Sequence, residues 1–262
     1  MSDNASPKKG FAEVNGLKMY YEIHGEGSPL VLIHGGGSTI ETTFGRIIAP
    51  LSGNRMLIAV ELQAHGHTND RDMDLSFEQD ADDIAELLKT LSIKKADFLG
   101  FSNGGNTAIE IALRHPGILR KLILASIIYK RSAAPDEFWE GFEGVTLDMI
   151  PEPLAQGYLE ANNDKEGLLN MFNKDVQRMK VFRGWTDDQM RSIVAPTLVI
   201  NGNNDVGSPE HAVEIYRVIP NTELAIFPGG HGSYLGEIAS TVNGSLPKFN
   251  VIELVEEFLD KP

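Results

Sequence analysis

The sequence predicts an α/β fold in which helices cover both faces of a mostly parallel, twisted sheet. Short apolar runs alternate with amphipathic segments along most of the 262 residues, and this alternation is typical of parallel sheets. Hydrophobic residues make up 42% of the chain, which is enough for a substantial core. One long region, residues 129–194, departs from the alternation and predicts a helical insertion.

The expected sheet begins with a hairpin. Residues 11–14 and 19–23 are expected to pair as antiparallel strands, because Asn15-Gly16 between them suits a type I′ turn. The remaining expected strands are short apolar runs at residues 30–33, 56–60, 98–99, 122–125, 197–200 and 223–227.

Helices are expected between these strands. Residues 77–91 place Ile84, Leu87, Leu88 and Leu91 on one stripe, with carboxylates on the other side, which is the pattern of an amphipathic helix. The other expected helices lie at residues 108–113, 209–218 and 251–259.

The region 129–194 has no strand signal and holds short helix-like pieces rich in Phe, Trp, Met and Leu. An insertion of this length within a repeating α/β pattern favours a helical subdomain over a loop. We therefore expect a core of residues 1–128 and 195–262 and a helical cap, or lid, of residues 129–194.

Composition excludes several classes of function. The net charge of −14 argues against nucleic acid and anionic membrane surfaces, which need a basic face. The chain has no cysteine, which removes disulfides, thiolate zinc sites and a cysteine nucleophile. His65 and His67 form a pair, but no further ligand at suitable spacing completes a metal site. We expect a small-molecule substrate, no metal and no cofactor, and leave the oligomeric state open.

The location is expected to be cytoplasmic. The first residues contain no apolar run of the signal-peptide kind, although a trimmed exported form would look the same. No segment reaches the about 18 continuous apolar residues that favour a transmembrane helix.

Ser102 lies in Gly100-Phe101-Ser102-Asn103-Gly104, between an expected strand and an expected helix. Such a Gly-x-Ser-x-Gly turn presents a nucleophilic serine on a strained backbone, and the glycines let the turn close. The alternative is a serine that caps the helix in a glycine-rich loop.

His34-Gly35-Gly36-Gly37 directly follows a strand and provides backbone amides without obstructing side chains. We expect an oxyanion hole formed by the amide of Asn103, which follows the nucleophile, and one amide of this loop. Gly36 is the first choice and Gly37 the second. The alternative for the loop is a tight strand-to-helix turn.

An acid and a base follow later strands. Asp205 comes just after residues 197–200, where a carboxylate can orient a histidine; an Asx turn is the alternative. His231, in Pro228-Gly-Gly-His-Gly232, is the histidine that follows the next strand. The order Ser102, Asp205, His231 is one of the known orders of a catalytic triad.

The segments LVLIHGGGS, LQAHGHT, LGFSNGGNTAIEIALRHP, APTLVINGNND and FPGGHG resemble the α/β-hydrolase fold superfamily in order and spacing. Within it, the chain resembles the group of carboxylesterases, proline iminopeptidases and cofactor-free haloperoxidases. The resemblance implies Ser102 as nucleophile, His231 as general base and acid, Asp205 as its orienter, and Gly36 and Asn103 as oxyanion donors. It also implies a lid formed by the 129–194 region.

Two departures from the family pattern stand out. Many relatives carry an acidic residue and an arginine before Gly-His-Gly, whereas this chain has Glu61-Leu-Gln-Ala-His65-Gly66-His67. The segment 232–247, which contains Tyr234 and several small residues, is longer than a bare connection requires and is a candidate for lining the mouth of the site.

The leading hypothesis is a serine hydrolase that cleaves carboxylic esters through an acyl-enzyme. The apolar composition of the expected cap favours an apolar acyl or alkyl group, although the same side chains would equally pack the cap onto the sheet. Alternatives on the same triad are an aminopeptidase, a carbon–carbon bond hydrolase and a perhydrolase or haloperoxidase. From a different class, a ligand-binding receptor with little turnover is the further alternative.

Overall fold

The structure is a computed structural model that describes residues 6–240 and 251–262. Within these residues, eight strands form one sheet in the order β1-β2-β4-β3-β5-β6-β7-β8. Only the pairs β1–β2 and β2–β4 are antiparallel, and every other neighbouring pair is parallel. The strands are β1 (Lys8–Val14), β2 (Leu17–His24), β3 (Ser28–Ile33), β4 (Arg55–Val60), β5 (Ala96–Phe101), β6 (Leu119–Ala125), β7 (Thr197–Gly202) and β8 (Thr222–Phe227).

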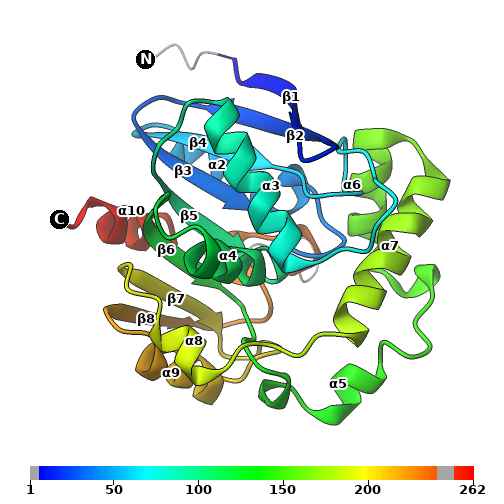
Figure 1. Ribbon diagram of the computed structural model, residues 1–262. Coiled ribbons are helices and arrows are strands. Elements are labelled where there is room, and N and C mark those ends of the chain that lie inside the picture. The colour runs from blue at the N-terminus through cyan, green and yellow to red at the C-terminus, as the bar shows by residue number, and fades with distance from the viewer. Residues whose placement is uncertain (1–5, 241–250) are drawn as a thin grey trace.

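Helices cover both faces of the sheet, which confirms the predicted fold class (Figure 1). The helices outside the region 129–194 are α1 (Ile40–Phe44), α2 (Ile48–Leu51), α3 (Phe77–Thr90), α4 (Asn103–Arg114), α9 (Pro209–Val218) and α10 (Val251–Asp260). Two short 3₁₀ turns, η3 (Ser233–Leu235) and η4 (Ile238–Ser240), follow β8. None of the helices in the described ranges is long and apolar enough to cross a bilayer.

The predicted hairpin turn is present between β1 and β2. Asn15 and Gly16 have φ values of 48° and 79°, and a type I′ turn requires a positive φ at both positions. This turn places the antiparallel part of the sheet at one edge, away from the parallel strands that follow.

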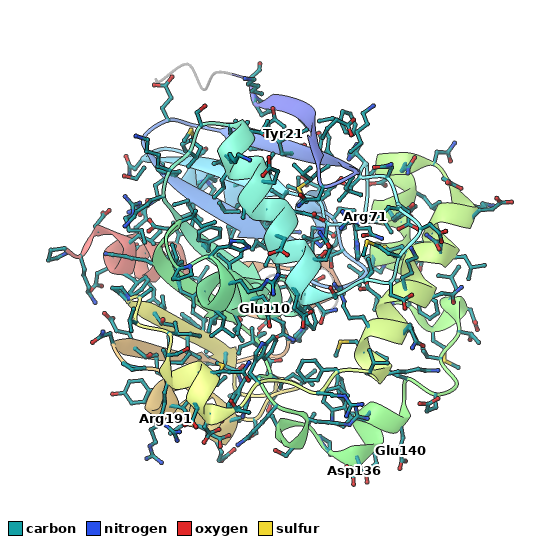
Figure 2. The ribbon with its side chains drawn as sticks, viewed as in Figure 1. Tyr21, Arg71, Glu110, Asp136, Glu140 and Arg191 are labelled. Carbon is teal, nitrogen blue, oxygen red and sulfur yellow. The ribbon has the colours of Figure 1, made fainter. Side chains whose placement is uncertain are left out.

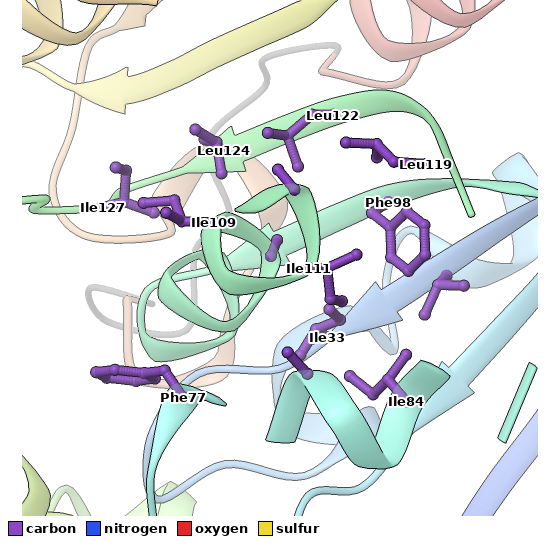
Figure 3. Packing of buried hydrophobic residues seen from close by; sticks show 14 of the residues in the cluster. Ile33, Phe77, Ile84, Phe98, Ile109, Ile111, Leu119, Leu122, Leu124 and Ile127 are labelled. Atoms are coloured by element: carbon purple, nitrogen blue, oxygen red, sulfur yellow. The ribbon is translucent and has the colours of Figure 1, made fainter. Parts of the chain in front are cut away.

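Helix α4 lies against the centre of the sheet, as Figure 3 shows. Its Ile109 and Ile111 pack with Ile33 of β3, Phe98 of β5 and Leu124 of β6 in one buried cluster. Burying side chains of this size stabilises the fold by about 1.5–3 kcal/mol each. The start of α4 is therefore held firmly against the carboxyl ends of the central strands.

The region between β6 and β7 is helical. It contains η1 (Arg131–Ala133), α5 (Asp136–Glu140), η2 (Leu147–Met149), α6 (Glu152–Asn162), α7 (Lys165–Lys180) and α8 (Asp187–Arg191). In Figure 1, α5, α6 and α7 lie together to one side of the sheet, and we call this group the cap helices. The division of the chain at residues 129 and 194 stays a prediction.

Charged side chains join α7 to the core. The Lys174 ammonium lies 2.6 Å from an Asp70 carboxylate oxygen, and the Arg178 guanidinium lies 2.9 Å from Asp80. Both side chains of the Arg178–Asp80 pair are almost fully buried. A buried charge without its partner is costly, so losing either residue would destabilise the fold.

Candidate active site

Ser102 lies between the last residue of β5 and the first residue of α4, with φ 53° and ψ −123°. A side chain at positive φ strains the backbone by about 1–3 kcal/mol. Ser102 occupies the N-cap position of α4, but its hydroxyl makes no cap hydrogen bond to the helix. The hydroxyl is therefore not engaged in capping the helix.

The two glycines of the motif are required by close backbone contacts. A Cβ at Gly100 would collide with the carbonyl of Gly104, and a Cβ at Gly104 would collide with the carbonyl of Ile33. The turn is held from the other side by the Ser102 amide, which donates to the Ala125 carbonyl of β6 at 2.8 Å. The strain at Ser102 is thus imposed by the packed strands around it.

Asp205 and His231 form a direct pair. Asp205 lies three residues after the end of β7, His231 lies after β8, and His231 Nδ1 is 2.6 Å from Asp205 Oδ1. Burial alone would raise the pKa of Asp205, but the hydrogen bonds from His231 and Ser126 hold that pKa below its usual value. An ionised Asp205 fixes the proton of His231 on Nδ1 and leaves Nε2 as the basic nitrogen.

Ser126 was not predicted from the sequence as part of the site. It directly follows β6, has a φ of 53°, and its hydroxyl donates to Asp205 Oδ2 at 2.5 Å. The Tyr234 hydroxyl lies 2.7 Å from the Ser126 hydroxyl oxygen and donates to the Ile200 carbonyl. Ser126 therefore occupies the carboxylate oxygen of Asp205 that His231 leaves free.

Tyr234 belongs to the segment 232–247 that was expected at the mouth of the site, but its own side chain does not line the cavity. It is almost fully buried behind Asp205, where the loop after β8 packs back against the sheet. The part of the segment 232–247 from residue 241 onward lies outside the described residues.

Ser102 and His231 line the same cavity, which has a volume of about 370 Å³. In the residues that the structure describes, no hydrogen bond joins the Ser102 hydroxyl to the His231 ring; such bonds often form only when substrate is bound. Most of the cavity wall is apolar and comes from the cap: Phe138, Phe142, Met149, Ile150, Leu154 and Phe172.

The amides of Gly36 and Asn103 are available at this cavity. Both residues line it beside Ser102, and neither amide has a backbone or side-chain acceptor in the described part of the chain. The amide of Gly37 is already engaged, because it donates to Asp175 Oδ2 at 2.5 Å. Of the two glycines considered for the oxyanion hole, the geometry favours Gly36.

A buried ionic network stands behind Gly37, and sequence reasoning missed it. Asp175 of α7 contacts His65 at 2.9 Å and forms an ion pair with Arg178, which also contacts Asp80. The only sequence signal was the three-residue spacing of Asp175 and Arg178, which indicates a helix-surface pair rather than a link to the core.

The network shifts several pKa values. Burial would raise the pKa of Asp175, but Arg178 and His65 hold it well below its usual range. For His65, burial lowers the pKa while Asp175 raises it, and the raising effect is the larger. Burial raises the pKa of Asp80 to about 6 in spite of Arg178.

The paired histidines of the sequence serve separate partners. His65 contacts Asp175, whereas His67 Nδ1 lies 2.9 Å from Glu61. Within residues 6–240 and 251–262, no group of three or more potential ligand side chains is placed to hold a metal ion.

The fold and the site together define a class of protein: an α/β sheet that carries a serine on a strained strand–helix turn and a His–Asp pair after later strands. Comparison with known proteins agrees with this class. Residues 30–239 match the family model described as the alpha/beta hydrolase family. The chain belongs to this family.

Individual relatives are distant. The human serine hydrolase BPHL is 28% identical over 83% of this chain and 77% of its own length. The non-heme chloroperoxidase CPO-A1 of Kitasatospora aureofaciens is 27% identical over 94% of this chain and 98% of its own length. The solved structure of a serine hydrolase involved in carbazole degradation superimposes with a TM-score of 0.78 at 20% identity, covering 97% of this chain and 99% of that one.

Proposed function

We propose that this protein is a serine hydrolase that cleaves a carboxylic ester of a small or medium-sized, partly apolar substrate through an acyl-enzyme. One observation carries the proposal: Ser102, on a strained turn, and His231, oriented by Asp205 at 2.6 Å, line one apolar cavity. A serine hydroxyl needs an oriented base to become nucleophilic at neutral pH.

The proposed reaction uses each of these groups once per half-reaction. His231 Nε2 accepts the Ser102 proton as Ser102 Oγ bonds to the ester carbonyl carbon, and the carbonyl oxygen becomes an oxyanion at the Gly36 and Asn103 amides. His231 then protonates the departing alcohol as the ester bond breaks. Water, deprotonated by His231, adds to the acyl-enzyme and releases the acid and free Ser102.

The cavity supports an apolar acyl or alkyl group. Its volume of about 370 Å³ lies within the range of about 300–1,000 Å³ for small-molecule sites. The cap supplies aromatic and aliphatic side chains to the wall, and Met and Phe side chains accommodate substrates of varied shape.

The aminopeptidase alternative receives no support from the cap carboxylates. Recognition of a substrate ammonium group would need a free carboxylate at the cavity. The five carboxylates of residues 137–152 are all exposed and none lines the cavity: Glu137, Glu140, Glu143, Asp148 and Glu152. Figure 2 shows Glu140 on the outer side of α5, pointing away from the core. Asp175 does line the cavity, but Arg178 and His65 neutralise it.

Assays distinguish ester hydrolysis from the other reactions proposed for Ser102, Asp205 and His231. Among the relatives is the chloroperoxidase, so peroxide is included with the esters, together with a dienoic diketone for carbon–carbon bond cleavage. A receptor would instead bind a ligand tightly with negligible turnover across the panel.

The proposal is tested with a fluorophosphonate probe followed by mapping of the adduct and a panel of p-nitrophenyl esters. We expect labelling at Ser102 and ester turnover, both lost in Ser102→Ala. Ester hydrolysis that survives Ser102→Ala, or an adduct on another serine, would refute the mechanism.

A further inference from the structure

Asn106 is a buried polar residue in the wall of the cavity. It lies on α4, four residues after Ser102, and lines the same cavity as Ser102 and His231. Only 2% of the residue is exposed, and its side-chain oxygen has no hydrogen-bond partner among the described residues. Buried side-chain oxygens are nearly always hydrogen-bonded, so an exception calls for a reason.

The other polar side chains of the wall outside the catalytic pair already have partners or lie elsewhere. Asp175 is held by Arg178, His65 and the Gly37 amide, and Ser126 is held by Asp205. The Asn103 side chain lies so close to Gly36 that a Cβ on that glycine would be 2.5 Å from Asn103 Nδ2. Asn103 thus stands beside the expected oxyanion, while Asn106 lies one turn farther along α4.

An asparagine at this position is unfavourable for the folded chain without a ligand. Asn has a lower helix propensity than Leu or Met, and the same cavity wall includes apolar side chains such as Ile128, Val176 and Met179. A leucine of similar volume would avoid both the helix penalty and the unpaired oxygen.

We propose that Asn106 is a specificity residue. Its carboxamide turns about the last side-chain bond, a broad two-fold torsion, so that the oxygen faces the cavity and accepts a hydrogen bond from a hydroxyl or amide N–H group on the acyl part of the substrate. Four residues of helix span about 6 Å along the axis, so the donor group lies several bonds from the scissile carbonyl. The substrate class is an ester of a hydroxy- or acylamino-carboxylic acid. This assignment rests on the proposed ester hydrolysis.

The test compares matched esters. We measure kcat/KM for p-nitrophenyl hexanoate, for its β-hydroxy derivative and for its β-, γ- and δ-acetamido derivatives, in the wild type, Asn106→Leu and Met179→Leu. In the wild type, one polar derivative is preferred over hexanoate by roughly tenfold or more. Asn106→Leu loses this ratio through a higher KM for the polar ester while still hydrolysing hexanoate, and Met179→Leu, a volume-conserving change in the same wall, keeps the ratio.

Because each ratio is taken within one variant, it does not depend on the fraction of folded protein. Asn106→Leu also has a melting temperature higher by roughly 2–4 °C, since the unpaired buried oxygen is gone. Asn106→Ala provides the same comparison if leucine does not fit.

A second measurement separates this inference from the proposed function. In Ser102→Ala, which binds without turnover, the hydroxy acid raises the melting temperature more than hexanoic acid does, and adding Asn106→Leu abolishes the difference. Absence of ester turnover with this binding difference intact refutes the proposed hydrolysis but supports Asn106. The inference is overturned if the ratios of kcat/KM and the shifts in melting temperature are the same with Asn106 and with Leu at this position. In that case an ordered water is the only partner of the Asn106 carboxamide.

Discussion

The Asp175 carboxylate of helix α7 accepts a hydrogen bond of 2.5 Å from the backbone amide of Gly37. The two residues belong to different parts of the chain: one to the cap helices and the other to the loop that follows β3. The bond occupies the amide of Gly37, while Gly36 lines the cavity beside Ser102. The conformation of the loop beside Ser102 thus depends on the position of α7.

Removing the positive charge of Arg178, which pairs with both Asp80 and Asp175, should lower the free energy of unfolding of the whole protein. Arg178→Met leaves the buried carboxylate of Asp80 without its cation and leaves Asp175 with His65 and the Gly37 amide alone; breaking a buried pair in this way costs about 3–5 kcal/mol. Lys174→Met is the matched control, because it removes a more accessible cap–core pair with Asp70 and should cost about 1 kcal/mol. Urea unfolding measures both, and equal losses for the two variants would contradict a special role for the buried pair.

Ser126→Ala tests the support of Asp205, the proposed orienter of His231. The change removes the hydrogen bond to Asp205 Oδ2, so the carboxylate, which the Gly202 and Val206 amides still hold, is oriented less firmly toward His231. We expect kcat to fall roughly tenfold with little change in KM, because Ser126 acts through His231. Tyr234→Phe removes a hydroxyl one step farther away and should have a smaller effect. A larger loss in Tyr234→Phe than in Ser126→Ala would show that the tyrosine, not the serine, positions Asp205.

The strain at Ser102 predicts a gain in stability when the side chain is removed. Ser102→Gly relieves a positive φ of 53° and should raise the free energy of unfolding by about 1–3 kcal/mol. Ser102→Ala removes the same hydroxyl but keeps the Cβ, so it should give little or no gain. Both variants are expected to be inactive. If the two are equally stable in urea, the backbone at Ser102 is not strained.

His34 makes the stability of the protein sensitive to acid. Burial, together with the charge of His65, lowers the pKa of His34 from 6.5 to about 3, while its Nε2 accepts from the Leu62 amide at 3.1 Å. Between about pH 6.5 and 3 the unfolded chain therefore binds a proton that the folded chain does not. This difference lowers the free energy of unfolding as the pH falls, with a slope approaching about 1.4 kcal/mol per pH unit.

His34→Gln should flatten this dependence, as measured by urea unfolding at several pH values in that window. His67 provides a control of opposite sign, because Glu61 raises its pKa and its stabilising effect is present at low pH and lost as the pH rises. His67→Gln should therefore steepen the fall toward acid pH. If the free energy of unfolding of His34→Gln depends on pH as steeply as that of the wild type, the pKa of His34 is the same in the folded and the unfolded chain.

Much of the fold was predictable because its signals are local. Each strand of the parallel sheet is a short apolar run, and the Asn15-Gly16 turn is set by the conformations that these two residues allow. The turn at Ser102 was predictable for the same reason, since its glycines fill positions where backbones nearly touch.

The polar surroundings of the site were not predictable from local patterns. The bond between Gly37 and Asp175 joins residues 138 positions apart, and nothing near either residue indicates the other. Ser126 follows its strand without any distinguishing motif, and Asn106 looks like an ordinary polar residue in a helix. Only the three-dimensional structure shows that its side-chain oxygen has no hydrogen-bond partner among the described residues.

Two kinds of contact hold the cap helices to the rest of the protein, and the two kinds differ in how well they tolerate substitution. Helix α7 depends on buried ion pairs of defined geometry, whereas α5 is held by aromatic packing such as Trp139 stacked on Phe182. Aromatic contacts tolerate exchange among apolar residues, while a buried ion pair does not survive the loss of one partner. Descendants of this protein can therefore acquire new substrates by substitution around α5 and η2, while Asp175 and Arg178 stay fixed under selection for folding.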